Sequence, residues 1–198
     1  MPNLTNLFYD LTSLQKTKCY IETGAYRGDG IKAVMNFYDQ VHSIELSPQW
    51  VDFNQNQFRD FQNIFIHSGD SKKVLPQILE GIEEPVTIHL DAHYSGGPTA
   101  FGEEETPLIQ ELEFLKTRSY DDIIIIDDCR MVGKKGISGL GPDHPIYPNM
   151  NFDWTHITNK KIKSLMKEDY FLISNQVHQF TDGARDRYIM CKKPLWLV

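Results

Sequence analysis

Acidic residues stand at the ends of successive apolar runs in this chain. These residues are Glu22, Glu45, Asp70, Asp91 and the pair Asp127-Asp128. Parallel strands place their carboxyl ends along one edge of an open α/β sheet, which is where ligands bind. One such acid is readily explained as a solvated surface group, but its repetition at strand after strand favours a shared site.

A glycine-rich turn follows the first predicted strand, Tyr20 to Thr23, and leads into an apolar-periodic helix from Ile31 to Tyr38. The turn contains Gly24, Gly28 and Gly30. A strand, a glycine turn and a helix together present backbone N–H groups and a helix N-terminus to a ligand. A glycine turn of this kind could bind any nucleotide, so the prediction of the ligand depends on the neighbouring acids.

Two of these acids fit the adenosine part of a ligand. Glu45 has two acceptor oxygens for the two ribose hydroxyls, and Asp70 can accept from an exocyclic amine, with Ser71 as a further donor. Structural alternatives exist for both acids. Glu45 also fits as a charge near the helix that begins at Ser47, and Asp70 as an N-cap of the next helix.

Three segments resemble the cofactor motifs of class I S-adenosylmethionine-dependent methyltransferases, in register from about Tyr20 to Asp128. They are Glu22-Thr-Gly-Ala-Tyr-Arg-Gly-Asp-Gly30, Ile44-Glu45 and Gly69-Asp70-Ser71. The first departs from the commoner Glu/Asp-x-Gly-x-Gly-x-Gly form, because three residues separate its first two glycines. His93-Tyr-Ser-Gly-Gly97, Thr106-Pro107 and Asp127-Asp128 resemble a methyltransferase-like branch of that superfamily. The resemblance implies S-adenosylmethionine as cofactor, held by Glu22, Gly24, Tyr26, Gly28, Gly30, Glu45, Asp70, Ser71 and Asp91.

The carboxylates of Asp91, Asp127 and Asp128 end two strands that are expected to be neighbours. Unpaired, they would repel one another and raise one another's pKa values. A divalent cation relieves such repulsion; Mg²⁺ suits the oxygen ligands, and Ca²⁺ and Mn²⁺ are alternatives. The group is similar to the Mg²⁺ site of metal-dependent O-methyltransferases of the catechol and macrolide-sugar types, which implies these three residues as metal ligands. The alternative is that Asp91 holds only the cofactor and Asp128 pairs with Arg130.

Methyl transfer needs an aligned nucleophile that loses its proton. His93, two residues after Asp91, is the candidate general base beside that catalytic carboxylate. A structural alternative is that His93 orders the turn from Ser95 to Gly97. The acceptor is expected to be a small hydroxylated molecule, covered by an irregular lid or substrate loop over residues 131–156. Glu103-Glu-Glu105 either lines the same mouth or places negative charge at the start of the next helix.

Two other functions compete with methyl transfer. Glu45 also fits an NAD- or nucleotide-sugar-binding Rossmann-type enzyme, but a dinucleotide turn reads Gly-x-Gly-x-x-Gly, and this one has three residues between its first two glycines. A catalytically silent methyltransferase-fold binding protein is the other alternative. The acids at Asp91, Asp127 and Asp128 count against it, because a scaffold has no need of their repulsion.

Composition limits the class of protein. The 198 residues suffice for a single domain, 1–198, and the net charge of −7 argues against general nucleic acid binding. The three cysteines are widely spaced, which predicts thiols in a reducing, cytoplasmic setting. No window is apolar enough to cross a membrane. A homodimer is left open as the assembly.

The order of predicted elements alternates strands with helices. Strands are expected at 20–23, 41–46, 63–67, 85–91, 122–127, 170–174 and 187–192, with helices between them and an N-terminal helix within residues 1–18. This alternation predicts an α/β fold, with a single doubly wound, mostly parallel sheet and helices on both faces. The resemblance implies the Rossmann-like methyltransferase form of that fold.

Overall fold

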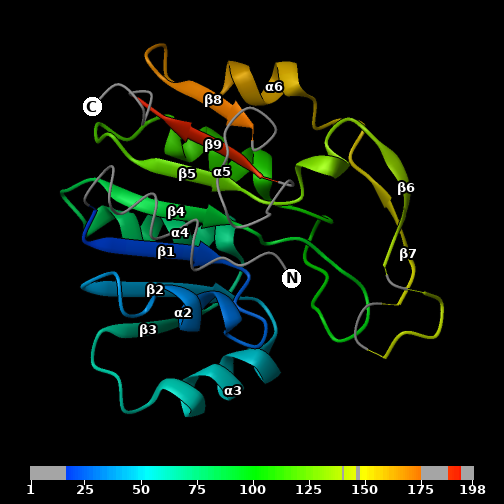
Figure 1. Cartoon of the computed structure of the whole chain (residues 1–198), viewed down its shortest axis with the longest axis horizontal. Coiled ribbons are helices and arrows are strands. Elements are labelled where there is room, and N and C mark those ends of the chain that lie inside the picture. Colours follow the sequence, from blue (N-terminus) through cyan, green and yellow to red (C-terminus); the bar gives the residue numbers. More distant parts are fainter. Residues whose placement is uncertain (1–16, 140, 146–147, 175–186, 193–198) are drawn as a thin grey trace.

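A seven-stranded sheet forms the centre of the computed structural model, which describes residues 17–139, 141–145, 148–174 and 187–192 (Figure 1). Its strands, in spatial order, are β3 (Ile64–Ser68), β2 (Gln40–Glu45), β1 (Cys19–Thr23), β4 (Val86–Leu90), β5 (Ile123–Ile126), β9 (Tyr188–Cys191) and β8 (Phe171–Ser174). The first five strands in this order are parallel to one another, and β9 is antiparallel to both of its neighbours. The predicted mostly parallel α/β sheet is confirmed.

Helices cover both faces of the sheet, as predicted. One face packs against α4 (Ser71–Glu80), α5 (Leu108–Leu115) and α6 (Asn159–Ser164), and the other packs against α2 (Asp29–Val34) and α3 (Pro48–Phe58). The four isoleucines of β5 alternate between these two cores and are each at most 4% exposed. A strand buried on both faces needs apolar residues at every position, which explains this continuous β-branched run.

The segment predicted as an irregular lid contains a small antiparallel sheet instead. Strands β6 (Lys135–Ser138) and β7 (Met150–Asp153) pair in the register Lys135↔Asp153 to Ser138↔Met150. The hairpin projects beyond the carboxyl ends of the parallel strands (Figure 1). Its strands are mostly exposed or half-buried and lack a regular apolar alternation, so the pattern that identifies strands is absent from them.

Several expectations fall on other parts of the chain. The predicted N-terminal helix lies outside the described residues. Cys19 and Cys191 are buried thiols, and Cys129 is a half-buried one. In the portion of the chain that the structure describes, no helix has both the length and the apolar character needed to cross a membrane.

Candidate functional site

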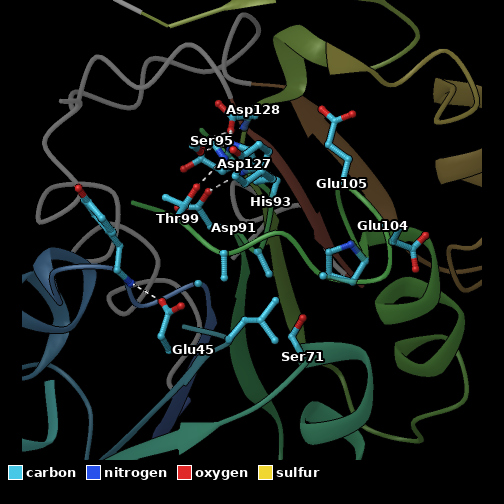
Figure 2. A pocket seen from close by; sticks show the side chains of 18 of the residues that line it. Glu45, Ser71, Asp91, His93, Ser95, Thr99, Glu104, Glu105, Asp127 and Asp128 are labelled. Carbon is cyan, nitrogen blue, oxygen red and sulfur yellow. Dashed lines mark hydrogen bonds and ion pairs between the residues drawn. The ribbon is translucent and has the colours of Figure 1, made fainter. Parts of the chain in front are cut away.

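A cavity of about 800 Å³ lies at the carboxyl edge of the sheet (Figure 2). Residues that follow β1, β2, β3, β4 and β5 line it, and the β6–β7 hairpin contributes a further wall. Of the predicted site residues, the wall contains Gly24, Tyr26, Glu45, Asp70, Ser71, Asp91, His93, Asp127 and Asp128. The parallel strands therefore bring most of the predicted site together, although Glu22, Gly28 and Gly30 do not line this cavity.

Glu22 lies beneath the glycine turn rather than in the cavity wall. Its side chain is buried and accepts a hydrogen bond from Ser43 Oγ at 2.7 Å. A Cβ atom at Gly30 would collide with Glu22 Oε2, so only glycine fits at that position. At Gly28 the chain is left-handed, with φ 73°, and this residue caps α2. These three residues therefore shape the turn from the side that faces away from the cavity.

Glu45 is held in place at the end of β2 by two backbone N–H groups. Oε2 accepts from Tyr26 N at 2.8 Å, and Oε1 accepts from Ser47 N at 2.8 Å. This bracing ties the glycine turn, in which Tyr26 has φ 43°, to the start of α3. Each carboxylate oxygen retains a second lone pair for a hydroxyl in the cavity.

Asp70 caps α4, which was the structural alternative for this residue. Asp70 Oδ1 accepts from Lys72 N at 3.2 Å, and Lys72 Nζ lies 3.8 Å from Oδ2. Asp70 nevertheless lines the cavity beside Ser71, which is 5% exposed. One carboxylate can cap a helix with one oxygen and face a ligand with the other, so both interpretations remain compatible with this geometry.

Glu111 on α5 is a buried acid that sequence patterning did not identify. It is 2% exposed, and its Oε1 has no hydrogen-bond partner among the described residues. Burial raises the pKa of Glu111 to about 7. The same cause raises the pKa of Glu22 to about 7, against the hydrogen bond from Ser43, which lowers it. Below about pH 7, both acids therefore hold protons in the folded chain that they would release on unfolding.

This difference predicts how stability depends on pH. Unfolding returns Glu111 to an ordinary pKa of 4.5, so between pH 4.5 and about 7 the folded chain binds more protons than the unfolded one. The contribution of Glu111 is fully present below pH 4.5 and is lost as pH rises through about 7. The Glu111→Gln variant should therefore lose less stability than wild type over this range, by about 3 kcal/mol, in urea unfolding at each pH.

The exposed Glu113 on the same helix provides the matched control for that experiment. Glu113→Gln should follow the wild-type pH profile, because its side chain is 52% exposed. A Glu111→Gln profile that is parallel to wild type would contradict the assignment of a raised pKa to this buried acid.

The cluster at the ends of β4 and β5 centres on His93, whose two ring nitrogens each face a carboxylate. His93 Nε2 lies 2.8 Å from Asp128 Oδ2, and Nδ1 lies 3.5 Å from Asp91 Oδ1. Ser95 Oγ also lies 2.8 Å from Nε2, so the predicted ordering of the Ser95 turn is present as well. Burial alone would lower the pKa of His93, but the two carboxylates outweigh it and raise the pKa to about 10. In the chain alone, the predicted base is therefore an imidazolium that donates hydrogen bonds.

Asp127 and Asp128 each pair with an arginine, and Asp127 also contacts the ring of His89. Asp127 Oδ2 lies 3.1 Å from Arg187 Nε and 3.3 Å from His89 Nε2, and Arg130 pairs with Asp128. The predicted alternative, a pair between Asp128 and Arg130, is thus present. The repulsion that the three carboxylates would suffer without partners is reduced by these contacts.

The pKa values of the three acids diverge for this reason. Burial raises the pKa of Asp91, and the charge of Asp127 raises it further. Burial also acts to raise the pKa of Asp127, but its hydrogen bond with His89 and the charge of Arg187 bring it below its usual range. His93 lowers the pKa of Asp128 in the same way. Asp91 is therefore the acid whose ionisation is least favoured.

Two overlapping groups in this cluster have the donors for a metal ion. One consists of His89, Asp91 and Asp127, and the other of Asp91, His93 and Asp128, with candidate ligand atoms within 4.8 Å of one another in each. The predicted trio is thus divided between the two groups, each with a histidine. Consecutive residues at a strand end project differently, and Asp128 adopts a left-handed φ of 56° that turns it toward His93.

His89 and Arg187 belong to the site although sequence patterning did not select them. A period of two along β4 places His89 on the same side of the strand as Asp91, so this proximity was accessible from the sequence. The contact of Arg187 with Asp127 could not be predicted from the sequence. The two residues are 60 positions apart in the chain, and they meet because β9 pairs antiparallel with β5.

Comparison with solved structures identifies the fold. An O-methyltransferase from Bacillus cereus in complex with SAH superposes with a TM-score of 0.61 at 14% identity, covering 96% of this chain and 80% of that one. TomG from Streptomyces achromogenes, an O-methyltransferase of tomaymycin synthesis in complex with SAM, gives 0.56 at 12% identity, covering 94% and 78%. CalS10, an amino pentose methyltransferase from Micromonospora echinaspora, gives 0.54 at 8% identity, covering 95% and 89%.

The chain therefore has the class I methyltransferase fold, as the resemblance implied. At these identities the similarity establishes the fold and leaves activity to be argued from the site. Searches with the sequence find no matching family model and no matching curated protein.

Proposed function

We propose that this protein is an S-adenosylmethionine-dependent methyltransferase that acts on a hydroxyl group of a small acceptor. The observation that carries the proposal is the division of one cavity into two chemically different ends. Glu45 and Ser71 lie at one end, and the cluster of His93, Asp91 and Asp128 lies at the other (Figure 2). An adenosine cofactor at the first end would direct its remaining atoms toward the second.

The first end supports adenosine because its donors and acceptors are already oriented. Glu45 is fixed by two backbone N–H groups, so it would accept ribose hydroxyls without reorganising. Asp70, held as the cap of α4, would accept from the adenine amine. Gly24, at φ 90°, brings the turn against the end of β4, where a Cβ atom would come within 2.6 Å of Asp91 O. A cofactor in the cavity would therefore lie close to backbone at this point.

The second end supports the loss of a proton from the acceptor. His93 is 13% exposed, lines the cavity and has a carboxylate on each ring nitrogen, so its orientation is fixed. We assign the acceptor's proton to His93, with Asp91 orienting the ring. In methyl transfer the acceptor oxygen attacks the methyl group of a sulfonium in line and the thioether leaves, so the protein's main contribution is this alignment.

The proposal includes a divalent cation, Mg²⁺ foremost, among Asp91, Asp127 and Asp128. The group of Asp91, His93 and Asp128 offers two carboxylates, the donors that Mg²⁺ accepts, and leaves the imidazole of His93 for the acceptor's proton. Asp91 and Asp128 fit best as ligands, because the Arg187 that pairs with Asp127 is 3% exposed and fixed by burial, whereas the Arg130 that pairs with Asp128 is 53% exposed. When bound, the cation would orient a hydroxyl, favour its ionised form and offset the charge that keeps His93 protonated.

Calorimetry on the purified chain tests the proposal. S-adenosylmethionine and S-adenosylhomocysteine should bind with micromolar or better affinity, whereas NAD and UDP-glucose should not. Addition of Mg²⁺ should give a separate binding signal that Asp91→Asn removes. Failure of both adenosine cofactors to bind would refute the methyltransferase assignment, and binding of NAD instead would support the dinucleotide alternative.

A further inference from the structure

The acidic triplet Glu103-Glu104-Glu105 is divided between the two sides of the cavity. Lys72 Nζ on α4 donates to Glu103 at 2.9 Å and to Glu104 at 3.0 Å, close to the proposed adenine contacts. Glu105 points elsewhere, as Figure 2 shows for its carboxylate and that of Glu104. Glu103 and Glu104 thus attach this acidic triplet to α4 on the cofactor side, whereas Glu105 makes different contacts.

Glu105 uses both carboxylate oxygens on the acceptor side. Oε1 accepts from Trp154 Nε1 at 3.1 Å, and Oε2 accepts from Asp153 N at 3.2 Å. The Glu105 carbonyl oxygen accepts from Tyr94 N at 2.8 Å, which joins this residue to the segment that carries His93. Because both oxygens turn to Trp154 and Asp153, the alternative of a charge serving the start of α5 does not describe this residue.

Trp154 connects these contacts to the site. Its ring packs edge-on against His93, with centroids 5.7 Å apart, and the residue is 2% exposed. Trp154 N donates to Lys134 O at 2.8 Å, which closes the base of the β6–β7 hairpin. That hairpin supplies Ile137 and Met150 to the cavity wall.

We infer that Glu105 is a positioning residue: by fixing Trp154 it sets both the ring of His93 and the hairpin wall that faces the acceptor. The inference rests on the proposed function for its catalytic meaning. The geometry itself, a carboxylate bridging an indole N–H and the adjacent backbone N–H, is independent of it. Hydrogen bonds to a charged acceptor are the stronger kind, so loss of this bridge should be measurable.

Glu105→Gln is the direct test. An amide has one acceptor oxygen and one NH₂ group, so it can serve only one of the two donors and opposes the other. We expect hydrogen exchange of the Trp154 indole proton and of the hairpin amides to quicken about tenfold. The NMR signal of the His93 ring proton should shift, because the indole beside it moves. Affinity for S-adenosylhomocysteine should stay within about twofold of wild type, since the cofactor side is untouched.

Glu103→Gln is the matched control, since it alters an acid of the same triplet that contacts Lys72 and Lys73 instead. It should leave the Trp154 and His93 signals unchanged. Trp154→Phe approaches the bridge from its other end by removing the indole N–H while keeping an aromatic ring. Hairpin exchange should quicken in this variant too, and the double variant Glu105→Gln/Trp154→Phe should exceed the faster single variant by no more than about twofold.

Unchanged indole exchange and an unshifted His93 signal in Glu105→Gln would overturn the inference. Multiplicative effects in the double variant would also overturn it, because they would mean that Glu105 and Trp154 act separately. These readouts need no methyl acceptor. Failure of the wild-type chain to bind S-adenosylhomocysteine would therefore refute the proposed function. The role of Glu105 in placing Trp154 would still be decided by the indole exchange and the His93 signal.

Discussion

Substitution of Glu45 by alanine should weaken binding of S-adenosylhomocysteine at least about 100-fold. The variant removes two charged acceptors for the ribose hydroxyls, and hydrogen bonds to charged groups contribute about 1.5–3 kcal/mol each. It also removes the brace between Tyr26 N and Ser47 N, so the glycine turn would lose its fixed position against α3. Isothermal calorimetry measures the loss directly.

Two further variants separate ligand contact from damage to the turn. Asp52→Ala removes an exposed acid of α3 close to Glu45 in sequence and should bind as wild type does. Glu45→Gln keeps one acceptor oxygen and should lie between wild type and alanine. Wild-type affinity in Glu45→Ala would exclude this carboxylate from the cofactor site, and with it the adenosine orientation on which the proposal depends.

Most of the sheet was predictable because its signals are local. Continuous apolar residues identify β5, and Ser47-Pro48 marks the start of α3. The β6–β7 hairpin could not be predicted, since strands such as Lys135–Ser138 are largely exposed and have no apolar periodicity. What stabilises the hairpin includes the contacts of Glu105 with Trp154 and Asp153, which join positions 48 and 49 residues apart in the chain.

The site was predictable in position and less so in electrostatics. Carboxyl ends of parallel strands meet at one edge, so the acids converge as the alternation of elements predicted. Their counter-charges come from residues that no short motif marks, above all Arg187 on the approach to β9. A sequence motif shows which acids are present. The partners that set the pKa of each acid depend on which strands are neighbours in the sheet, and a motif does not show this.

Asp91 and Asp127 should consequently respond in opposite ways to the same substitution. Asp127→Asn should lower the free energy of unfolding by about 3 kcal/mol, because its Oδ2 faces Arg187 in a site where the arginine side chain is 3% exposed. The asparagine NH₂ would oppose the Arg187 N–H, while Oδ1 could still accept from Asp128 N. Urea unfolding at pH 7 measures this difference.

Asp91→Asn should leave stability unchanged or raise it by up to about 1 kcal/mol, because burial and the charge of Asp127 oppose ionisation of Asp91. Because the pKa of Asp91 is raised in the folded chain, the contribution of this group to stability is lost as pH rises. The free energy of unfolding of Asp91→Asn, relative to wild type, should therefore be highest at the higher pH. It should also fail to bind Mg²⁺ while remaining folded, which would make Asp91 an acid retained for function. A loss of several kcal/mol in Asp91→Asn, or none in Asp127→Asn, would reverse the assignment of the structural and the functional carboxylate.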